Sequence, residues 1–188
     1  ENITVKADLI DGQNIRQVGE QIGKGDLALS SGTTITAGGI GYVAALGIDK
    51  VKVTALPKIA VYVTGNELVK PGTIPEYGEV FESNSYALDA ALQSSNFRSP
   101  TIKTLVDDYA TTLNNIKEGI EQFDVVLLTG GISVGDYDFV GKALKELGVE
   151  EIFYKVMQKP GKPLYFGKLE ETYVFALPGN PAAALTCF

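Results

Sequence analysis

The stretch DVVLLTGG, residues 124–131, decides the fold more clearly than any other part of this sequence. Four apolar side chains follow one another from Val125 to Leu128, and a threonine and two glycines end the run. A short apolar run that stops at glycine is typical of a strand buried on both faces, as in a parallel sheet. We therefore expect a buried parallel strand here.

Strand and helix patterns alternate outward from this strand in both directions. A short apolar run predicts a strand at residues 59–63, and further strands are expected at residues 101–105 and 152–156. Apolar spacing predicts helices near residues 87–92, 113–123 and 140–147. A hairpin joining residues 164–166 and 173–177 and a last helix after the turn at 178–181 complete the pattern. This alternation predicts the α/β class, with an open, mostly parallel sheet and helices on both faces.

The first part of the chain has a different pattern of apolar and polar residues. Apolar spacing predicts a short helix at residues 15–22, and a serine- and glycine-rich turn predicts a tight hairpin over residues 27–35. Thr36 is expected to cap a second helix that glycine ends at position 47. Valines alternate with lysines at residues 51–53, as in a half-exposed strand. We expect a small, partial α+β segment.

The expected domain organisation follows from this change of sequence pattern. We expect a boundary near Pro57, with a partial segment at residues 1–56 and the α/β domain at residues 57–188. The chain starts without methionine and stops inside an expected helix, so we expect it to be part of a longer protein.

Composition excludes several classes of protein. The 188 residues are 45% hydrophobic and 21% charged, as in a globular protein, and no apolar run is long enough for a membrane span. The net charge of −7 argues against a nonspecific nucleic-acid binder. The single cysteine, Cys187, allows no internal disulfide, which fits a cytoplasmic setting. The absence of histidine removes serine–histidine and cysteine–histidine catalysis and every histidine metal site.

Glycines and carboxylates follow the expected strands, where ligands bind in open α/β sheets. The stretches are TGNE at 64–67, the acids Asp107 and Asp108, TGGISVGDYD at 129–138 and LPGNP at 177–181. Glycine allows close backbone approach to an anion, and carboxylates hold Mg²⁺. These features favour an anionic substrate that carries a metal. The stretch 129–138 matches neither the dinucleotide signature nor the P-loop.

Two of these features leave alternatives open. Asp107 and Asp108 could be a helix N-cap and its solvated neighbour rather than site residues. Lys155, Lys159 and Lys162 surround a Pro-Gly turn, and they could form either a charged hairpin turn or a clamp for an oxyanion.

Taken together, the motifs resemble one family. TGNEL (64–68), ESNS (82–85), LLTGGISVGDYD (127–138), KPGKP (159–163) and LPGNP (177–181) resemble, in order and spacing, the molybdopterin molybdenumtransferases of the MoeA type, a family shared with the gephyrin E domain. The segment GQNIRQVGEQIGKGD (12–26) is also similar to that family. The resemblance implies that residues 57–188 are a three-layer α/β/α molybdopterin-binding domain and that residues 1–56 are a partial linker or dimerisation segment.

The resemblance also implies a function. Members of the family insert molybdenum from molybdate into adenylated molybdopterin, with Mg²⁺-dependent release of AMP. They are cytoplasmic homodimers, and a molybdopterin adenylyltransferase is a possible partner. Two alternatives stay open for this chain: a molybdopterin adenylyltransferase, or a non-catalytic domain that binds molybdopterin or acts as a scaffold. We expect the chain alone to bind ligand but to be incomplete for catalysis.

Residue roles are implied by matching each position to its motif. The expected catalytic residues are Glu67, Asp107, Asp108 and Asp138, with Glu67 and Asp138 on the metal. The expected substrate-binding residues are Thr64, Gly65, Gly130, Gly131, Ser133, Asp136, Lys155, Lys159, Lys162, Pro178, Gly179, Asn180 and Pro181. Asn66 and Asn14 stand where the family usually has acids, and asparagine can ligate a metal but cannot act as a base.

Overall fold

The computed structural model describes residues 4, 8, 10–132 and 139–188. The chain divides into two compact units, Glu1–Thr54 and Ala55–Phe188, close to the boundary expected from the sequence. Each unit is described by itself below.

The first unit contains helix α1, Ala37–Ala45, as expected. Its N-cap is Thr36, whose hydroxyl accepts a hydrogen bond from the Gly39 N–H at 3.2 Å. Such a cap satisfies one of the backbone donors that a helix start leaves free. Only Val43 of this helix is buried, so α1 packs against little within its own unit.

Three other predictions for this unit are wrong. Residues 15–22 form turns instead of a helix, residues 27–35 form no strand pair, and residues 51–53 are in no strand. Gly19 lies in the middle of the expected helix at φ +79°, and Ile15 is 65% exposed. Short helices and isolated strands are not stable without an apolar surface to pack against, and Ile15, Val18 and Leu27 stay exposed here.

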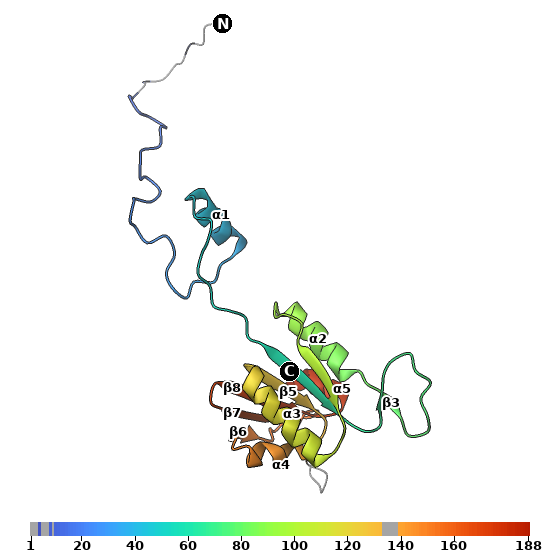
Figure 1. Ribbon diagram of the computed structural model, residues 1–188. Coiled ribbons are helices and arrows are strands. Elements are labelled where there is room, and N and C mark those ends of the chain that lie inside the picture. The colour runs from blue at the N-terminus through green and yellow to red at the C-terminus, as the bar shows by residue number, and fades with distance from the viewer. Residues whose placement is uncertain (1–3, 5–7, 9, 133–138) are drawn as a thin grey trace. The chain divides into compact units, whose positions relative to one another are not determined.

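The second unit is built on a six-stranded sheet in the order β4-β1-β5-β8-β7-β6 (Figure 1). The strands are β1 (Ile59–Thr64), β4 (Thr101–Leu105), β5 (Val125–Thr129), β6 (Glu150–Tyr154), β7 (Tyr165–Leu169) and β8 (Thr172–Leu177). The pairs β4–β1, β1–β5 and β5–β8 are parallel, whereas β7 runs antiparallel to β8 and β6. The mostly parallel sheet and its hairpin are therefore confirmed.

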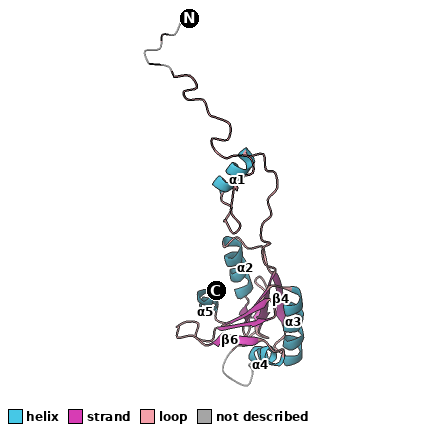
Figure 2. Ribbon diagram, turned by 90° about the vertical axis from the view of Figure 1, so that its left-hand side faces the viewer, coloured by secondary structure: helices cyan, strands magenta, loops and turns pink. Residues whose placement is uncertain are grey.

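Helices cover both faces of this sheet, which gives the three layers seen in Figure 2. The helices are α2 (Asn84–Ser94), α3 (Tyr109–Gln122), α4 (Phe139–Glu146) and α5 (Pro181–Cys187). On one face, Ile116 and Val140 from α3 and α4 pack into a core with Leu128 of β5. On the other face, Leu88 and Ala184 from α2 and α5 pack into a second core that includes the sheet residues Val61, Val63 and Leu127. The α/β/α sandwich is confirmed.

A small second sheet was not expected from the sequence. It pairs β2 (Leu68–Val69) with β3 (Val80–Phe81) in parallel, and it carries the chain from the end of β1 to the start of α2. The Val80 N–H donates to the Glu67 carbonyl at 2.8 Å, which fixes the turn after β1.

Candidate functional site

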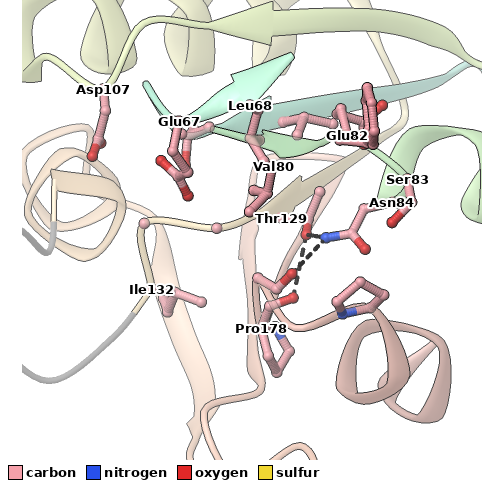
Figure 3. Close-up of a pocket in the computed structure, with 18 of the residues that line it drawn as sticks. Glu67, Leu68, Val80, Glu82, Ser83, Asn84, Asp107, Thr129, Ile132 and Pro178 are labelled. Carbon is pink, nitrogen blue, oxygen red and sulfur yellow. Dashed lines mark hydrogen bonds between the residues drawn. The ribbon is translucent and has the colours of Figure 1, made fainter. Parts of the chain in front are cut away.

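A cavity of about 580 Å³ lies at the carboxyl edge of the large sheet (Figure 3). The parallel register explains its position, because Val63 pairs with Thr129 and Thr129 pairs with Leu177, so three strands end level with one another. The turns that follow β1, β5 and β8 therefore meet at one place. This is the crevice in which open α/β sheets bind ligands.

Nine of the residues expected at the site line this cavity. They are Thr64, Gly65, Glu67, Asp107, Gly130, Gly131, Pro178, Gly179 and Pro181. The turns after β1, β4, β5 and β8 contribute to this set. Its first and last members, Thr64 and Pro181, are 181 − 64 = 117 positions apart in the sequence. The structure thus brings together the strand-end residues that the sequence places far apart.

Other expected residues lie elsewhere in the structure. Asp108 is the exposed N-cap of α3, where its carboxylate accepts the Thr111 N–H at 2.8 Å. Asn180 caps α5 through the Ala183 N–H at 3.1 Å. Neither lines the cavity, so for Asp108 the capping alternative describes its contacts. Ser133, Asp136 and Asp138 lie outside the described residues.

The lysine turn approaches the cavity through its last proline, Pro163, which lines the wall. The Val156 N–H donates to the Lys162 carbonyl at 2.9 Å, which closes the turn. The side chains of Lys155, Lys159 and Lys162 are exposed and do not line the cavity, and the Lys155 ammonium lies 4.8 Å from the centroid of the Tyr154 ring.

The glycines after β5 are required by close packing. Gly130 adopts φ +86°, and a Cβ there would lie 2.5 Å from the Thr64 carbonyl oxygen. Gly131 adopts φ +62°, and a Cβ there would lie 2.9 Å from a methyl carbon of Val140. A side chain at either position would meet both a strained backbone and a steric clash. The main chain of this turn therefore forms the cavity wall itself.

Two carboxylates form an acidic corner of the cavity. In Figure 3, Glu67 and Asp107 come from the turns after β1 and β4 and both face the cavity. Burial raises the pKa of the Asp107 carboxyl, and the negative charge of Glu67 raises it further. The Asp107 Oδ1 atom is buried without a hydrogen-bond partner. A cation or a proton would satisfy this corner.

The donor set can be tested against Mg²⁺, the ion that the family resemblance implies. Among the described residues, no group of three or more acidic, histidine or cysteine side chains is placed to hold a metal ion. Mg²⁺ is usually held by one or two protein carboxylates, and water and substrate phosphate complete its coordination. The pair formed by Glu67 and Asp107 fits that pattern in donor type, and no protein group fills the hydrogen-bonding positions of the buried Asp107 Oδ1 atom.

Asn66 makes a contact that sequence reasoning missed. Its side-chain oxygen accepts the Asp107 backbone N–H at 3.0 Å, although the two residues are 41 positions apart. The sequence indicated only that this oxygen could ligate a metal. In the structure the oxygen joins the turn after β1 to the turn after β4.

The beginning of α2 forms the opposite wall and was also missed. Asn84 donates from its side-chain nitrogen to the Thr129 hydroxyl and to the Gly179 carbonyl, both at 2.8 Å. Glu82 is buried and accepts from the Ser85 backbone N–H at 2.8 Å and from the Ser85 hydroxyl. The ESNS motif was the available signal: polar residues at a helix start are ordinarily exposed caps, whereas Glu82, Asn84 and Ser85 are buried and only Ser83 is exposed.

The arrangement has a defined chemical capability. The glycine turns present backbone rather than side chains to a ligand, as phosphate sites commonly do. The acidic corner repels an anionic ligand unless a cation lies between the carboxylates and the anion. A ligand that combines a phosphate with a bound divalent cation satisfies both walls. Among the described residues, no helix is long and apolar enough to cross a membrane.

Comparison with known proteins points to the same region. Residues 60–188 match the family described as "Probable molybdopterin binding domain". A protein named molybdopterin molybdenumtransferase from Haemophilus influenzae is 36% identical over 94% of this chain and 43% of its own length. A protein of the same name from Staphylococcus aureus is 33% identical over 100% of this chain and 45% of its own length.

Solved structures similar to this chain also come from proteins of molybdopterin biosynthesis. The crystal structure of a molybdopterin biosynthesis moeA protein from Pyrococcus horikosii is similar, with a TM-score of 0.72 and 32% identity, over 89% of this chain and 41% of that one. The MoaB structure from Thermus thermophilus has a TM-score of 0.53 at 16% identity over 69% of this chain and 85% of that one, which shows the fold alone. The chain therefore spans less than half the length of the curated relatives it matches.

Proposed function

We propose that this chain, which belongs to the family of probable molybdopterin binding domains, binds molybdopterin or its adenylate in the cavity at the carboxyl edge of its sheet. One observation carries the proposal. Two glycine turns and two carboxylates meet in a single cavity of about 580 Å³, and the residues that form it lie within the matched range 60–188.

Each wall has a role in this proposal. The backbone of Gly130 and Gly131 would bind the phosphate, with Pro178 and Gly179 lining the cavity directly beside them. Glu67 and Asp107 would hold Mg²⁺, which supplies positive charge to the phosphate when it is bound. The exposed lysines at 155, 159 and 162 would contact molybdate or phosphate, and Asp138 would add a further acid to the metal.

The activity that we propose for the parent protein is insertion of molybdenum from molybdate into adenylated molybdopterin, with release of AMP. The name molybdopterin molybdenumtransferase, which both relatives carry, supports this activity. The homodimer, the cytoplasmic location and the adenylyltransferase partner are proposed from the family resemblance. Exposed apolar side chains in the first unit, such as Ile15, Val18 and Ile40, are consistent with a partner surface there.

Calorimetric titration of the 188-residue chain with adenylated molybdopterin, with and without Mg²⁺, tests the proposal. We expect Mg²⁺-dependent binding that Glu67→Gln weakens about tenfold, because the substitution removes one charge from the cation site. Glu121→Gln is the matched control, since Glu121 is exposed on α3 outside the cavity and should leave binding unchanged. No binding by the unmodified chain contradicts the proposal.

A second assay separates the proposal from its alternatives. Incubation of the chain with molybdopterin and Mg-ATP should produce no adenylated molybdopterin. Production of the adenylate would identify an adenylyltransferase instead. Binding by the chain without molybdenum insertion is the expected result, whereas turnover equal to that of the full-length protein would show that the remaining parts are not needed.

A further inference from the structure

The turn after β4 is held to the turn after β1 by one side chain. Asn66 Oδ1 accepts the backbone N–H of Asp107 at 3.0 Å. On the other side of Asp107, the Asp108 N–H donates to the Val106 carbonyl at 2.8 Å and the Asp108 carboxylate caps α3. The hydrogen bond from the Asp107 N–H to Asn66 therefore holds the main chain on the one side of Asp107 that these bonds leave free, and the Asp107 side chain enters the cavity from this main chain.

The chemistry of the acceptor also matters at this position. Asp107 and Glu67 line the same cavity, so two carboxylates already meet at this corner, and one Asp107 oxygen is buried without a partner. An amide oxygen can hold the Asp107 N–H without adding charge, whereas a carboxylate would make the same bond and bring a third negative charge. A third charge would attract a divalent cation more strongly.

We propose that Asn66 is a positioning residue that holds Asp107 at the acidic corner and, because it is neutral, limits the affinity of that corner for a divalent cation. The cation part of this inference rests on the proposed function, whereas the positioning part rests on the hydrogen bond alone.

The positioning part is tested by amide hydrogen exchange of the 15N-labelled chain without added metal. Asn66→Ala removes the acceptor, so exchange of the Asp107 amide should become about two- to tenfold faster, the range expected for one lost hydrogen bond. Asn66→Asp keeps an acceptor, so exchange should return to the unmodified rate. An unchanged rate in Asn66→Ala overturns the positioning role.

The charge part is tested by calorimetric titration with Mg²⁺ alone at low ionic strength. Asn66→Asp should bind Mg²⁺ about three- to tenfold more tightly, because an added negative charge several ångströms from the cation attracts it by about this amount. Asn66→Ala should bind more weakly than the unmodified chain. Asn114→Asp is the matched control, because it adds the same charge at an exposed position on α3 that does not line the cavity.

The outcomes separate this inference from the proposed function. Equal Mg²⁺ affinities for Asn66→Asp and Asn114→Asp overturn the charge part, even when adenylated molybdopterin still binds. Loss of Mg²⁺ binding in every variant overturns both the proposed metal role and the charge part. Failure of the unmodified chain to bind adenylated molybdopterin, with the exchange pattern as expected, overturns the proposed function and leaves the positioning role standing.

Discussion

The two units of this chain contain similar apolar patterns but reach different structures. In the second unit, Leu128 and Ile116 are completely buried between sheet and helix, and the patterns around them form the expected elements. In the first unit, Ile15 is 65% exposed and its helix-like spacing produces only turns. The difference teaches that periodicity predicts an element only where another element covers its apolar face.

The largest expected effect comes from removing buried side chains in the second unit. Leu128→Ala should lower the free energy of unfolding by about 2–5 kcal/mol, because it removes packing and leaves a cavity. Ile15→Ala in the first unit should change it by less than about 0.5 kcal/mol. Urea unfolding followed by circular dichroism measures both. Equal effects from the two substitutions would break the comparison.

Glycine-to-alanine substitutions should also destabilise the second unit more than the first, but by a smaller difference in the free energy of unfolding. Gly130→Ala should destabilise the protein by about 2–4 kcal/mol, because backbone strain adds to the clash with Thr64. Gly47→Ala should cost only about 1–2 kcal/mol of local strain, since φ is +77° there but no atom lies within 4 Å of the added Cβ. The same unfolding assay compares them, and a larger cost at Gly47 would contradict the packing account.

A buried tyrosine gives the second unit a dependence on alkaline pH. Burial, and to a lesser extent the charge of Glu151, raises the pKa of Tyr165 to about 12. The unfolded chain ionises near pH 10, so stability is lost as the pH rises from about 10 to 12. We expect Tyr165 to contribute about 1–2 kcal/mol to this loss, and Tyr165→Phe should remove that contribution. Tyr62, whose pKa burial also raises, should keep its own contribution in both proteins. The difference between the two unfolding curves at pH 9 and pH 11.5 measures the Tyr165 contribution, and parallel changes in both proteins would exclude Tyr165 as the cause.

The smallest expected effect sharpens the comparison within the second unit. Thr64 and Thr112 both carry a buried hydroxyl without a hydrogen-bond partner, but only Thr64 lines the cavity. Replacing either by valine should leave stability unchanged or raise it by up to about 1 kcal/mol, because no satisfied bond is lost. Thr64→Val alone should also weaken the binding of adenylated molybdopterin in a titration. Equal binding by the two variants would show that the Thr64 hydroxyl does not contact the ligand.

Much of the sheet could be predicted from the sequence. The strand β4 begins and ends at the residues predicted, Thr101 and Leu105. The acids that follow β1 and β4 were expected near one another because parallel strands end at a common edge. The strands β2 and β3 have two residues each, which is too short for any periodicity to show. Their pairing depends on backbone hydrogen bonds between residues far apart in the sequence, such as the one from the Val80 N–H to the Glu67 carbonyl.

The rest of the site could not be predicted, because it depends on the direction in which each side chain leaves its turn. Asp107 and Asp108 are neighbours with the same chemistry, yet one enters the cavity and the other caps α3. Asn84 is buried because α2 begins against the ends of β5 and β8, and no local pattern specifies that contact. The lysines were expected on the basis of charge, but the direction of their side chains depends on the path of the turn.

The place of β8 in the sheet has a consequence for how the protein is made. Among the strands of this sheet, β8 is synthesised after all the others, yet it lies between β5 and β7. Until residue 177 has left the ribosome, β5 has no partner on that side and the turns after β5 and β8 cannot meet. The cavity therefore forms as a late event in folding, and a nascent chain stopped before β8 would expose an open strand edge, which is a template for aggregation.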